Sequence, residues 1–403
     1  NRLILKAFKP YIGLPRGVYI LFFARIINAM GNFVFPLLTM YLTDKLGLSS
    51  KTAGQFVSLA AMSYFPGAII GGKLSDHIGR KKVLITSQLL AGLLFLPCAF
   101  LEKSMLIPWL LILAGVMNGA AQPASSALLT DITTKENRKQ SFSLLYLGIN
   151  IGFSVGPLIA GFLYKNYIQW VFLGNTISII VATFLVAHFV EDKKAEINNE
   201  DEELLADEDS NTFRELLKRK QLLVFGVISI AFSFAYSQGN FATTMQLKEG
   251  FGQEASKYVG LLNSVNGLTV IILTTVIIHI TKKNKAIFNI FLAGIFFAVG
   301  FGMLYFVRSA HFYILSTIIW TIGEILSATN SGVYIANHSP TNYRARFSAL
   351  MNIISGFGHG IGPYLMGTFI GIYGVRMVWP LVFGITSIAT LLMFLLYKNE
   401  RSE

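Results

Sequence analysis

The stretch that decides the fold is Gly71-Gly72-Lys73-Leu74-Ser75-Asp76-His77-Ile78-Gly79-Arg80-Lys81-Lys82. It is a short polar segment between two long apolar runs, residues 56–70 and 83–101. Apolar runs of roughly 20 residues have the length at which an α-helix crosses a bilayer. A tight turn dense in glycine and cations between two such runs is typical of a membrane protein that works by changing shape.

The whole chain has the composition of a membrane protein. Of its 403 residues, 53% are hydrophobic and only 13% are charged, and the mean hydropathy is +0.58. Soluble domains carry about 25% charged residues. Backbone groups in lipid must be hydrogen-bonded internally, so only helices and closed barrels span membranes, and continuous apolar runs do not fit alternating barrel strands. The sequence therefore predicts an all-α membrane protein.

Charge and cysteine content exclude some other classes. The net charge is +12, which in a membrane protein reflects the positive-inside bias, so we expect no nucleic-acid partner. The single cysteine, Cys98, excludes a disulfide within the chain and a metal site built on cysteines. No phosphate-binding loop, metal cluster or catalytic triad stands out, so we expect no metal, no cofactor and no enzymatic activity.

The hydropathy pattern predicts twelve membrane helices and one polar linker. The stretch 191–220 is too polar to span a bilayer and includes the acidic run 200–203. We therefore expect an N-terminal six-helix bundle over 1–190, a cytoplasmic charged linker over 191–220 and a C-terminal six-helix bundle over 221–403. The predicted helices are 17–43, 53–72, 82–101, 106–130, 140–164, 168–190, 221–246, 257–280, 286–306, 310–337, 345–372 and 376–397.

The distribution of Lys and Arg predicts the orientation. The termini and every second loop, beginning with the loop between helices 53–72 and 82–101, hold most of these cations. Cytoplasmic loops carry the excess of positive charge. We therefore expect both termini in the cytoplasm.

The two halves resemble each other, which indicates an internal repeat. At an offset of 206 residues the second half repeats small residues and prolines of the first, and Gly31-Asn32-Phe33 resembles Gly239-Asn240-Phe241 at nearly the same offset. Two six-helix halves in the same orientation form a parallel repeat, and such repeats place a substrate site near the midplane between the halves. The matched pairs are Arg138 with Arg344, Gly152 with Gly358, Gly156 with Gly362, Pro157 with Pro363 and Gly161 with Gly367.

Three motifs give the chain its family resemblance. Residues 72–82 resemble the signature Gly-x-Leu-Ser/Ala-Asp-x-x-Gly-Arg-Lys/Arg of the major facilitator superfamily. Glycines 148, 152 and 156 with Pro157 resemble the antiporter motif of drug:proton antiporters, and Gly323-Glu324-Ile325 resembles proton-coupled multidrug exporters of low-GC Gram-positive bacteria. The resemblance covers essentially the whole length. It implies twelve membrane helices in two six-helix bundles related by a pseudo-two-fold axis.

The chain departs from the family pattern at two places. Many of these antiporters have an arginine four residues before a glycine in the helix corresponding to 106–130, and here Gly115 stands before Gly119. The proton-relay role of that arginine is therefore not carried over. The loop 279–285 has lost the Gly–Asp–Gly–Arg pattern of the first half. A conformational latch is therefore expected only at residues 72–82.

Glu324 is the candidate for proton coupling. It is the only acidic residue that falls at the middle of a predicted span. A carboxylate there is energetically expensive and usually faces a cavity and serves function. Burial favours the protonated form, so such a group can bind and release a proton as its exposure alternates. The structural alternative is a neutral glutamic acid that hydrogen-bonds a neighbouring helix.

Arg25 and a set of polar and aromatic residues are candidates for a substrate cavity. Arg25 is the only lysine or arginine away from the ends of a predicted span, and it either snorkels to the interface or pairs with a carboxylate or an anionic substrate group. The polar residues either line the cavity or join helices, and the aromatic ones either contact an apolar or cationic ligand or pack. The candidates are Arg25, Asn28, Asn32, Asn118, Gln122, Tyr236, Gln238, Asn240, Asn263 and Trp320.

The candidate latch comprises Gly72, Asp76, Gly79 and Arg80. Asp76 and Arg80 are four residues apart, so their simplest interaction is a surface ion pair of at most about 1 kcal/mol. The family resemblance implies instead that Asp76 lies against the N-terminus of helix 345–372 and holds the outward-facing state. A helix N-terminus stabilises a carboxylate, which supports this interpretation.

The glycine-rich helices are expected to pack at the interface between the halves. Glycines spaced by four residues form a smooth groove for close packing, and the following proline interrupts the helix hydrogen bonds. His359 lies among these glycines and either titrates or is a satisfied core histidine. The interface candidates are Gly148, Gly152, Gly156, Pro157, Gly358, Gly362 and Pro363.

Together these features predict a monomeric, proton-coupled secondary active transporter that works by alternating access. We expect it to export small amphiphilic or cationic compounds, as in multidrug efflux, from the cell (plasma) membrane of a bacterium. The proton gradient is the expected energy source, and a small-molecule substrate and membrane lipid are the expected partners. Alternatives of the same fold are a lipid or lipopolymer-precursor flippase and a proton-coupled uptake symporter. A non-transporting membrane receptor or scaffold is the alternative from another class.

Overall fold

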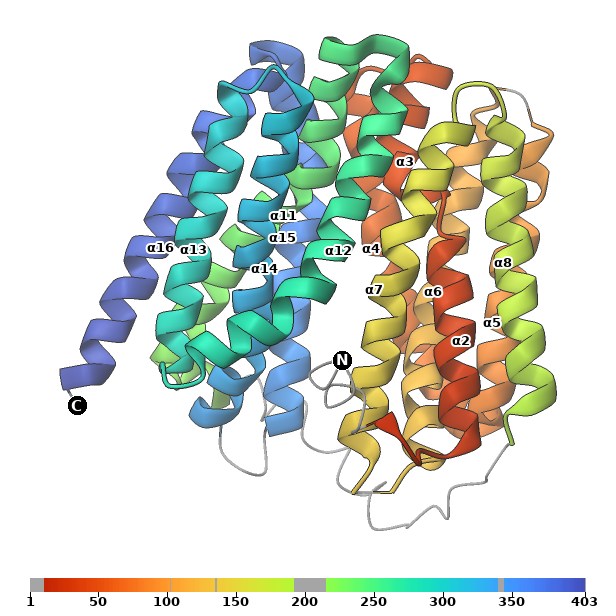
Figure 1. Cartoon of the computed structure of the whole chain (residues 1–403), viewed down its shortest axis with the longest axis horizontal. Helices are drawn as coiled ribbons and strands as arrows, with labels where there is room; N and C mark the ends of the chain where they lie inside the picture. Colours follow the sequence, from red (N-terminus) through yellow and green to blue (C-terminus); the bar gives the residue numbers. More distant parts are fainter. Residues whose placement is uncertain (1–10, 102, 135, 192–214, 340–343, 403) are drawn as a thin grey trace, which may run out of the picture. The chain divides into compact units, whose positions relative to one another are not determined.

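The computed structural model describes residues 11–101, 103–134, 136–191, 215–339 and 344–402. Helices and the turns between them make up this part of the chain, without a strand (Figure 1). Most of the predicted linker, residues 192–214, lies outside the described residues, as does the pair 342–343 of the repeat. The expectation of an all-α fold is confirmed.

The first half of the described chain contains seven α-helices and two short irregular turns of helix. These are α2 (Arg16–Met30), α3 (Val34–Met40), the π-helix η2 (Tyr41–Lys45), α4 (Ser50–Ile78), α5 (Arg80–Phe95), η3 (Pro97–Ala99), α6 (Leu106–Asp131), α7 (Arg138–Leu163) and α8 (Ile168–Phe189).

The second half of the described chain contains six long helices. These are α11 (Lys220–Phe251), α12 (Ala255–Thr281), α13 (Ala286–Gly302), α14 (Ala310–His338), α15 (Arg344–Tyr373) and α16 (Val378–Ser402), with short 3-10 turns η4 (Gly252–Glu254), η5 (Met303–Tyr305) and η7 (Val375–Met377).

Ten stretches of the described residues are long and apolar enough to cross a membrane. One of them, Lys220–Thr281, is made of two helices, α11 and α12, joined by the turn η4. The glycine-rich α15 is not among the ten, although it has 30 residues. The helical elements of the described chain therefore agree with the predicted set of spans, with α2 to η2 forming a single irregular one.

Packing groups the described chain into two compact units. Unit 1 holds the described residues of 1–48, 59–195 and 251–268, and unit 2 holds those of 49–58, 196–250 and 269–403. The beginning of α12 thus packs with the first unit, and the beginning of α4 packs with the second. The division of the sequence into bundles 1–190 and 221–403 stays a prediction.

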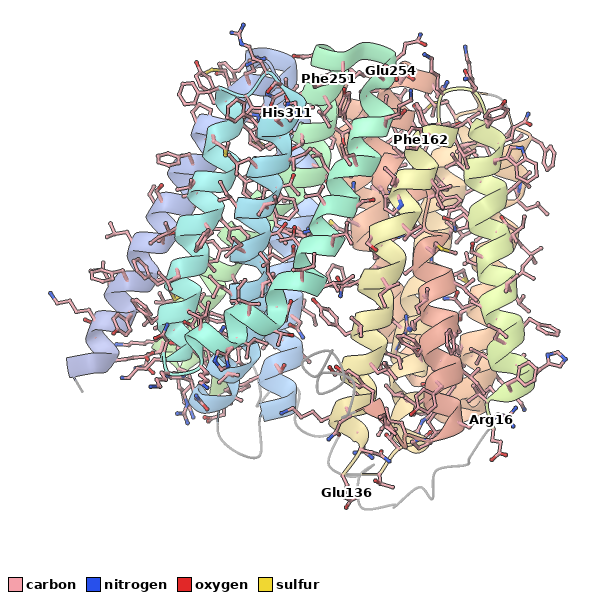
Figure 2. The ribbon with its side chains drawn as sticks, in the orientation of Figure 1. Arg16, Glu136, Phe162, Phe251, Glu254 and His311 are labelled. Atoms are coloured by element: carbon pink, nitrogen blue, oxygen red, sulfur yellow. The ribbon has the colours of Figure 1, made fainter. Side chains whose placement is uncertain are left out.

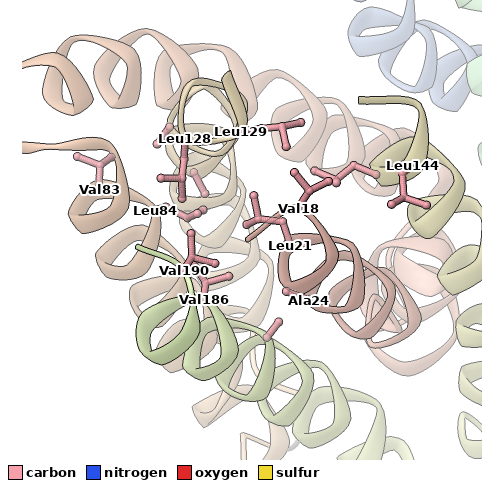
Figure 3. Packing of buried hydrophobic residues seen from close by; sticks show 14 of the residues in the cluster. Val18, Leu21, Ala24, Val83, Leu84, Leu128, Leu129, Leu144, Val186 and Val190 are labelled. Carbon is pink, nitrogen blue, oxygen red and sulfur yellow. The ribbon is translucent and has the colours of Figure 1, made fainter. Parts of the chain in front are cut away.

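The core of unit 1 is built from small and aliphatic side chains of five helices. Val18 and Leu21 of α2 lie beside Leu84 of α5, Leu128 of α6 and Val186 of α8, and all are buried (Figure 3). Lipid is as apolar as these side chains, so close van der Waals packing rather than removal from water holds the helices together.

The first span is broken where the sequence predicts one continuous helix over 17–43. The chain leaves helical geometry at residues 31–33, between α2 and α3. The backbone N–H of Phe33 donates to Oδ1 of Asn175 on α8 at 3.2 Å. At the offset of 208 that relates 31–33 to 239–241, the residue corresponding to Asn175 is Phe383, which has no side-chain acceptor. The matching Gly239-Asn240-Phe241 accordingly lies within the unbroken α11.

The stretch 71–82 is helical rather than a polar loop, which corrects the opening expectation. α4 continues to Ile78 and α5 begins at Arg80, so the chain turns at Gly79 alone. Gly79 has φ of +102°, a conformation that other residues rarely adopt. The charged segment is therefore a rigid helix end followed by a one-residue turn.

The glycine groove of α7 packs within its own unit, against α2. A Cβ at Gly152 would lie 2.6 Å from the carbonyl oxygen of Ile26, and one at Gly156 would lie 2.2 Å from the carbonyl oxygen of Met30. On α15, a Cβ at Gly358 would lie 2.2 Å from the carbonyl oxygen of Ile230 on α11. Gly152, Gly156 and Gly358 therefore allow backbone contact with the first helix of their own half, and the expectation that α7 and α15 pack at the interface between the halves stays a prediction.

Contacts with the other half of the sequence occur further along α7 and α15, at the two prolines. In unit 1, a Cβ at Gly260 of α12 would lie 2.4 Å from the carbonyl oxygen of Pro157. In unit 2, a Cβ at Gly54 of α4 would lie 2.2 Å from the carbonyl oxygen of Pro363. These close contacts explain why the beginnings of α12 and α4 pack where they do.

Candidate functional sites

The first candidate site, in unit 2, is centred on Glu324. This residue lies near the middle of α14 and is partly buried. The hydroxyl of Tyr236 on α11 donates a hydrogen bond to Oε1 of Glu324 at 3.1 Å. The structure thus brings together two residues that the sequence placed 88 positions apart.

Aromatic rings surround the Glu324–Tyr236 pair. The ring of Trp320, one turn before Glu324, meets the Tyr236 ring edge-on with 5.6 Å between centroids. The imidazole of His359 on α15 lies 6.0 Å from the same ring. On its other side Trp320 stacks on Phe301 at 5.5 Å. Phe301 is completely buried in an apolar helix, so no sequence signal distinguishes it from other packing residues.

This arrangement can do two things chemically. A carboxyl group that accepts a phenol hydrogen bond in a partly buried position can exist in either protonation state. The electron-rich faces of Trp320 and Tyr236 attract cations within about 6 Å. The group of side chains thus combines a titratable acid with an aromatic surface suited to a cationic or apolar ligand.

The second candidate site, in unit 1, is centred on Arg25 of α2. Its Nη2 donates to the hydroxyl of Ser125 at 2.7 Å, and both terminal nitrogens lie 3.3–3.4 Å from Oε1 of Gln122. Ser125 and Gln122 are three residues apart on α6, so they share one face of that helix. Ser125 was not among the predicted residues, although its spacing from Gln122 marks it as a neighbour.

A second polar contact joins α2 to α5 one turn from Arg25. Nδ2 of Asn28 donates to Oε1 of Gln88 at 3.0 Å. Gln88 is an interior polar residue of an apolar helix, a signal that the sequence carried and that the predictions did not use. Asn118 is partly buried on α6, one turn before Gln122, and Asn32 lies in the break between α2 and α3.

Three other predicted cavity residues take different positions. Gln238 is completely buried, and its Nε2 donates to the carbonyl of Phe234 on its own helix. Asn263 donates to the carbonyl of Val259, also on its own helix. Asn240 is exposed on α11. The structure therefore places Gln238, Asn240 and Asn263 outside the two groups described above, and Oε1 of Gln238 is buried without a described hydrogen-bond partner.

The predicted latch residues Asp76 and Arg80 do not form the ion pair with each other that their spacing allows. Arg80 forms an ion pair with Asp131, which ends α6, so Arg80 and Asp76 do not pair with each other. Asp76 is exposed. Its predicted contact at the start of α15 involves residues 344–346, whose side chains the structure does not describe. A Cβ at Gly72 would meet only Pro123, at 4.0 Å, so Gly72 makes no close contact.

Gly115 permits close packing of α4 and α6. A Cβ at Gly115 would lie 2.3 Å from the hydroxyl oxygen of Ser63. A long side chain at this position would push the two helices apart. In unit 1 the guanidinium of Arg25 on α2 reaches α6 at Gln122 and Ser125, seven and ten residues beyond Gly115.

An exposed charged bridge joins the end of α7 to the start of α12. Glu254 accepts a hydrogen bond from Lys165 at 3.0 Å and pairs with Lys257, and it lies at the same end of unit 1 as Phe162 (Figure 2). Hydrogen bonds from Lys257 and Lys165 lower the pKa of Glu254 below its ordinary value. The carboxylate therefore stays ionised at neutral pH.

Among the described residues no group of three or more His, Cys, Asp or Glu side chains could hold a metal ion. Glu324 and His359 are the titratable side chains described at the first site, and Arg25 is the cation at the second, beside the neutral side chains of Gln122 and Ser125.

Comparisons with known proteins identify the family. The model of the Major Facilitator Superfamily matches residues 21–363. The MFS-type transporter YttB of Bacillus subtilis (strain 168) is 27% identical over 391 residues, which cover 94% of this chain and 96% of that protein. A Na(+), Li(+), K(+)/H(+) antiporter of Planococcus maritimus is 24% identical, covering 82% of this chain and 84% of that protein.

More distant similarities agree with this result. The multidrug resistance protein MdtH of Photorhabdus laumondii is 29% identical over 160 residues, 38% of this chain and 39% of that protein. A POT family transporter solved with a thioalcohol-conjugated peptide superposes with a TM-score of 0.81, covering 97% of this chain and 98% of that one at 15% identity. At that identity the likeness shows the fold alone. The chain therefore belongs to the Major Facilitator Superfamily and is a multi-pass membrane transporter of that fold.

Proposed function

We propose that this protein is a proton-coupled exporter of small amphiphilic or cationic compounds in a bacterial plasma membrane, with both termini in the cytoplasm. The observation that carries the proposal is the Glu324–Tyr236 hydrogen bond beside Trp320 and His359. The antiporter of Planococcus maritimus and the MdtH protein are related at low identity, which supports proton exchange and drug export as the class of function.

Glu324 couples proton binding to substrate binding because the same group of side chains takes part in both. When the carboxyl is ionised, its charge and the rings of Trp320 and Tyr236 favour a cationic or amphiphilic ligand. When it binds a proton, that attraction disappears and the ligand is released. Alternating exposure of the site to the two sides of the membrane then exchanges a proton for a substrate molecule.

The test uses protein reconstituted in liposomes with an imposed pH gradient and a lipophilic cationic dye. We expect the wild type to move the dye against the direction of proton flow. Glu324→Gln should abolish transport driven by the gradient while leaving dye exchange at equal pH. Tyr236→Phe removes the hydroxyl that donates to Glu324, so we expect it to shift the pH dependence of transport and retain coupling.

The chain offers a matched control in a second Glu–Tyr pair. The hydroxyl of Tyr334 donates to Oε1 of Glu400 at 2.7 Å, near the end of α16 rather than at the middle of a span. Glu400→Gln should therefore leave gradient-driven transport intact. If Glu324→Gln exports the dye under the gradient as fast as the wild type, the proposal is refuted. Dye movement in the same direction as the protons would instead identify an uptake symporter.

A further inference from the structure

The guanidinium of Arg25 is a charge without a counter-charge in the described part of the molecule. Its hydrogen-bond acceptors there are the neutral side chains of Gln122 and Ser125, and no described carboxylate lies within 4.0 Å of it. Tyr64 on α4 is the ionisable side chain that interacts with it electrostatically, and a phenol is uncharged at neutral pH. The positive charge is therefore oriented by its neighbours and not neutralised by them.

Snorkelling does not explain this position. Arg25 is nine residues from the first residue of α2, about 13 Å along the helix axis. Its guanidinium is held by Ser125, which is six residues, about 9 Å, from the last residue of α6. The charged end therefore points across to α6 at depth rather than toward the helix ends. An unpaired cation at that depth is expensive, so such residues normally serve a ligand or ion pathway.

The neighbours of Arg25 leave hydrogen-bond donors facing outward. Because Oε1 of Gln122 accepts from the guanidinium, its amide N–H groups point the other way, and the Gln122 side chain is exposed. A guanidinium has five N–H groups in a planar fork, more than Gln122 and Ser125 occupy. Asn118 offers another amide one turn away on α6. Donors clustered around one fixed guanidinium match the oxygens of a carboxylate or phosphate.

We propose that Arg25, Gln122 and Ser125 form an oxyanion-binding subsite that receives a carboxylate or phosphate group. The inference rests on the proposed transport function and narrows its substrate class to amphiphiles that carry an oxyanion, zwitterions included. Arg25 binds the oxyanion through its fork, Gln122 donates from its amide, and Ser125 holds the guanidinium in place. The oxyanion belongs either to a soluble substrate or to a lipid headgroup.

The test compares two dyes that differ only at a carboxylate. Rhodamine 19 has a free carboxylate and rhodamine 6G is its ethyl ester. Binding is measured by fluorescence anisotropy on protein in nanodiscs of phosphatidylcholine. We expect the wild type to bind rhodamine 19 about tenfold more tightly than the ester, as a charge-assisted bidentate contact predicts. Arg25→Gln should remove this preference and leave binding of the ester unchanged.

Two further variants distinguish loss of the subsite from misfolding of Arg25→Gln. Gln122→Glu keeps the arginine and supplies an internal counter-charge, so it should also remove the preference. Lys165→Gln removes an exposed cation elsewhere in unit 1 and should preserve it. Equal affinity of the wild type for the two dyes overturns the proposal, as does absence of rhodamine 19 binding or an unchanged preference in Arg25→Gln.

The source of the oxyanion is decided by a second set of nanodiscs that contain phosphatidylglycerol. Competition by this lipid against rhodamine 19 in the wild type, and not in Arg25→Gln, identifies a lipid headgroup as the occupant; no competition identifies a soluble substrate. The two proposals fail separately. Gradient-driven, Glu324-dependent transport of rhodamine 6G without a carboxylate preference refutes only the subsite. A carboxylate preference in binding without gradient-driven transport refutes only the exporter.

Discussion

The closest backbone contact in the glycine groove of α7 predicts a sharp effect of one methyl group. In Gly156→Ala the new Cβ would lie 2.2 Å from the carbonyl oxygen of Met30 and 2.8 Å from its carbonyl carbon. Ordinary contacts begin at 3.4 Å, so α2 and α7 must separate by about 1 Å. The obstacle is backbone, which cannot rotate away as a side chain can. Overpacking of this kind costs about 3 kcal/mol, at the upper end of the usual range.

The effect is measurable as a loss of thermal stability. For a unit of roughly 200 residues, about 3 kcal/mol corresponds to a fall in apparent melting temperature of about 6–12 °C. The measurement is fluorescence-detected size-exclusion chromatography of detergent-solubilised protein after heating. Gly332→Ala is the matched control, because a Cβ at Gly332 of α14 would meet nothing within 4 Å.

Gly156→Ala should have a lower melting temperature than Gly332→Ala. Alanine is a better helix former than glycine by about 1 kcal/mol, so Gly332→Ala should hold or raise the melting temperature. If Gly156→Ala melts at the same temperature as Gly332→Ala, the close approach of α2 and α7 is not what stabilises unit 1, and the reasoning is refuted.

Two further predictions concern the polar ends of the bundles. Asp131→Asn breaks the ion pair with Arg80, in which the Asp131 side chain is 10% exposed and the Arg80 side chain 28%. We expect this variant to lower the free energy of unfolding by about 2 kcal/mol, whereas Lys165→Gln at the exposed bridge should change it little. Equal melting temperatures of the two variants would contradict this prediction. Asn289→Ala removes a buried amide that bonds Asn330 and the carbonyl of Thr281, so it should cost about 2 kcal/mol in the same assay. Asn240→Ala, at an exposed position, should leave the melting temperature unchanged. A similar loss of stability in Asn289→Ala and Asn240→Ala would contradict a stabilising role of the buried hydrogen bonds of Asn289.

Several elements of the fold follow from the sequence because membrane helices are local structures. An apolar run satisfies its own backbone hydrogen bonds, so its length and boundaries are readable from composition. The break at 31–33 was not predicted from the sequence, and the Phe33 N–H there donates to Asn175, a residue more than 140 positions away. The same three-residue motif stays helical in α11, where that acceptor is missing.

The candidate sites, too, were only partly predictable from the sequence. Glu324 stands out in the sequence because a carboxylate within a span is rare and expensive. Its alignment with Tyr236, and the role of Phe301 behind Trp320, depend on how α11, α13 and α14 pack. Gln238 is as polar as Gln122 in the sequence, yet the first is buried and the second exposed. Helix rotation decides this difference, and no single-residue property encodes it.

By itself the sequence determined the membrane class, the succession of spans and the superfamily signature, because these depend on local hydropathy and on short motifs. Only the tertiary structure decided that residues 71–82 form a helix end with a one-residue turn at Gly79, and that Arg80 pairs with Asp131 rather than Asp76. It also decided that the α7 glycines face α2. These outcomes depend on which helix faces which, and helix–helix packing joins residues that are distant in the chain.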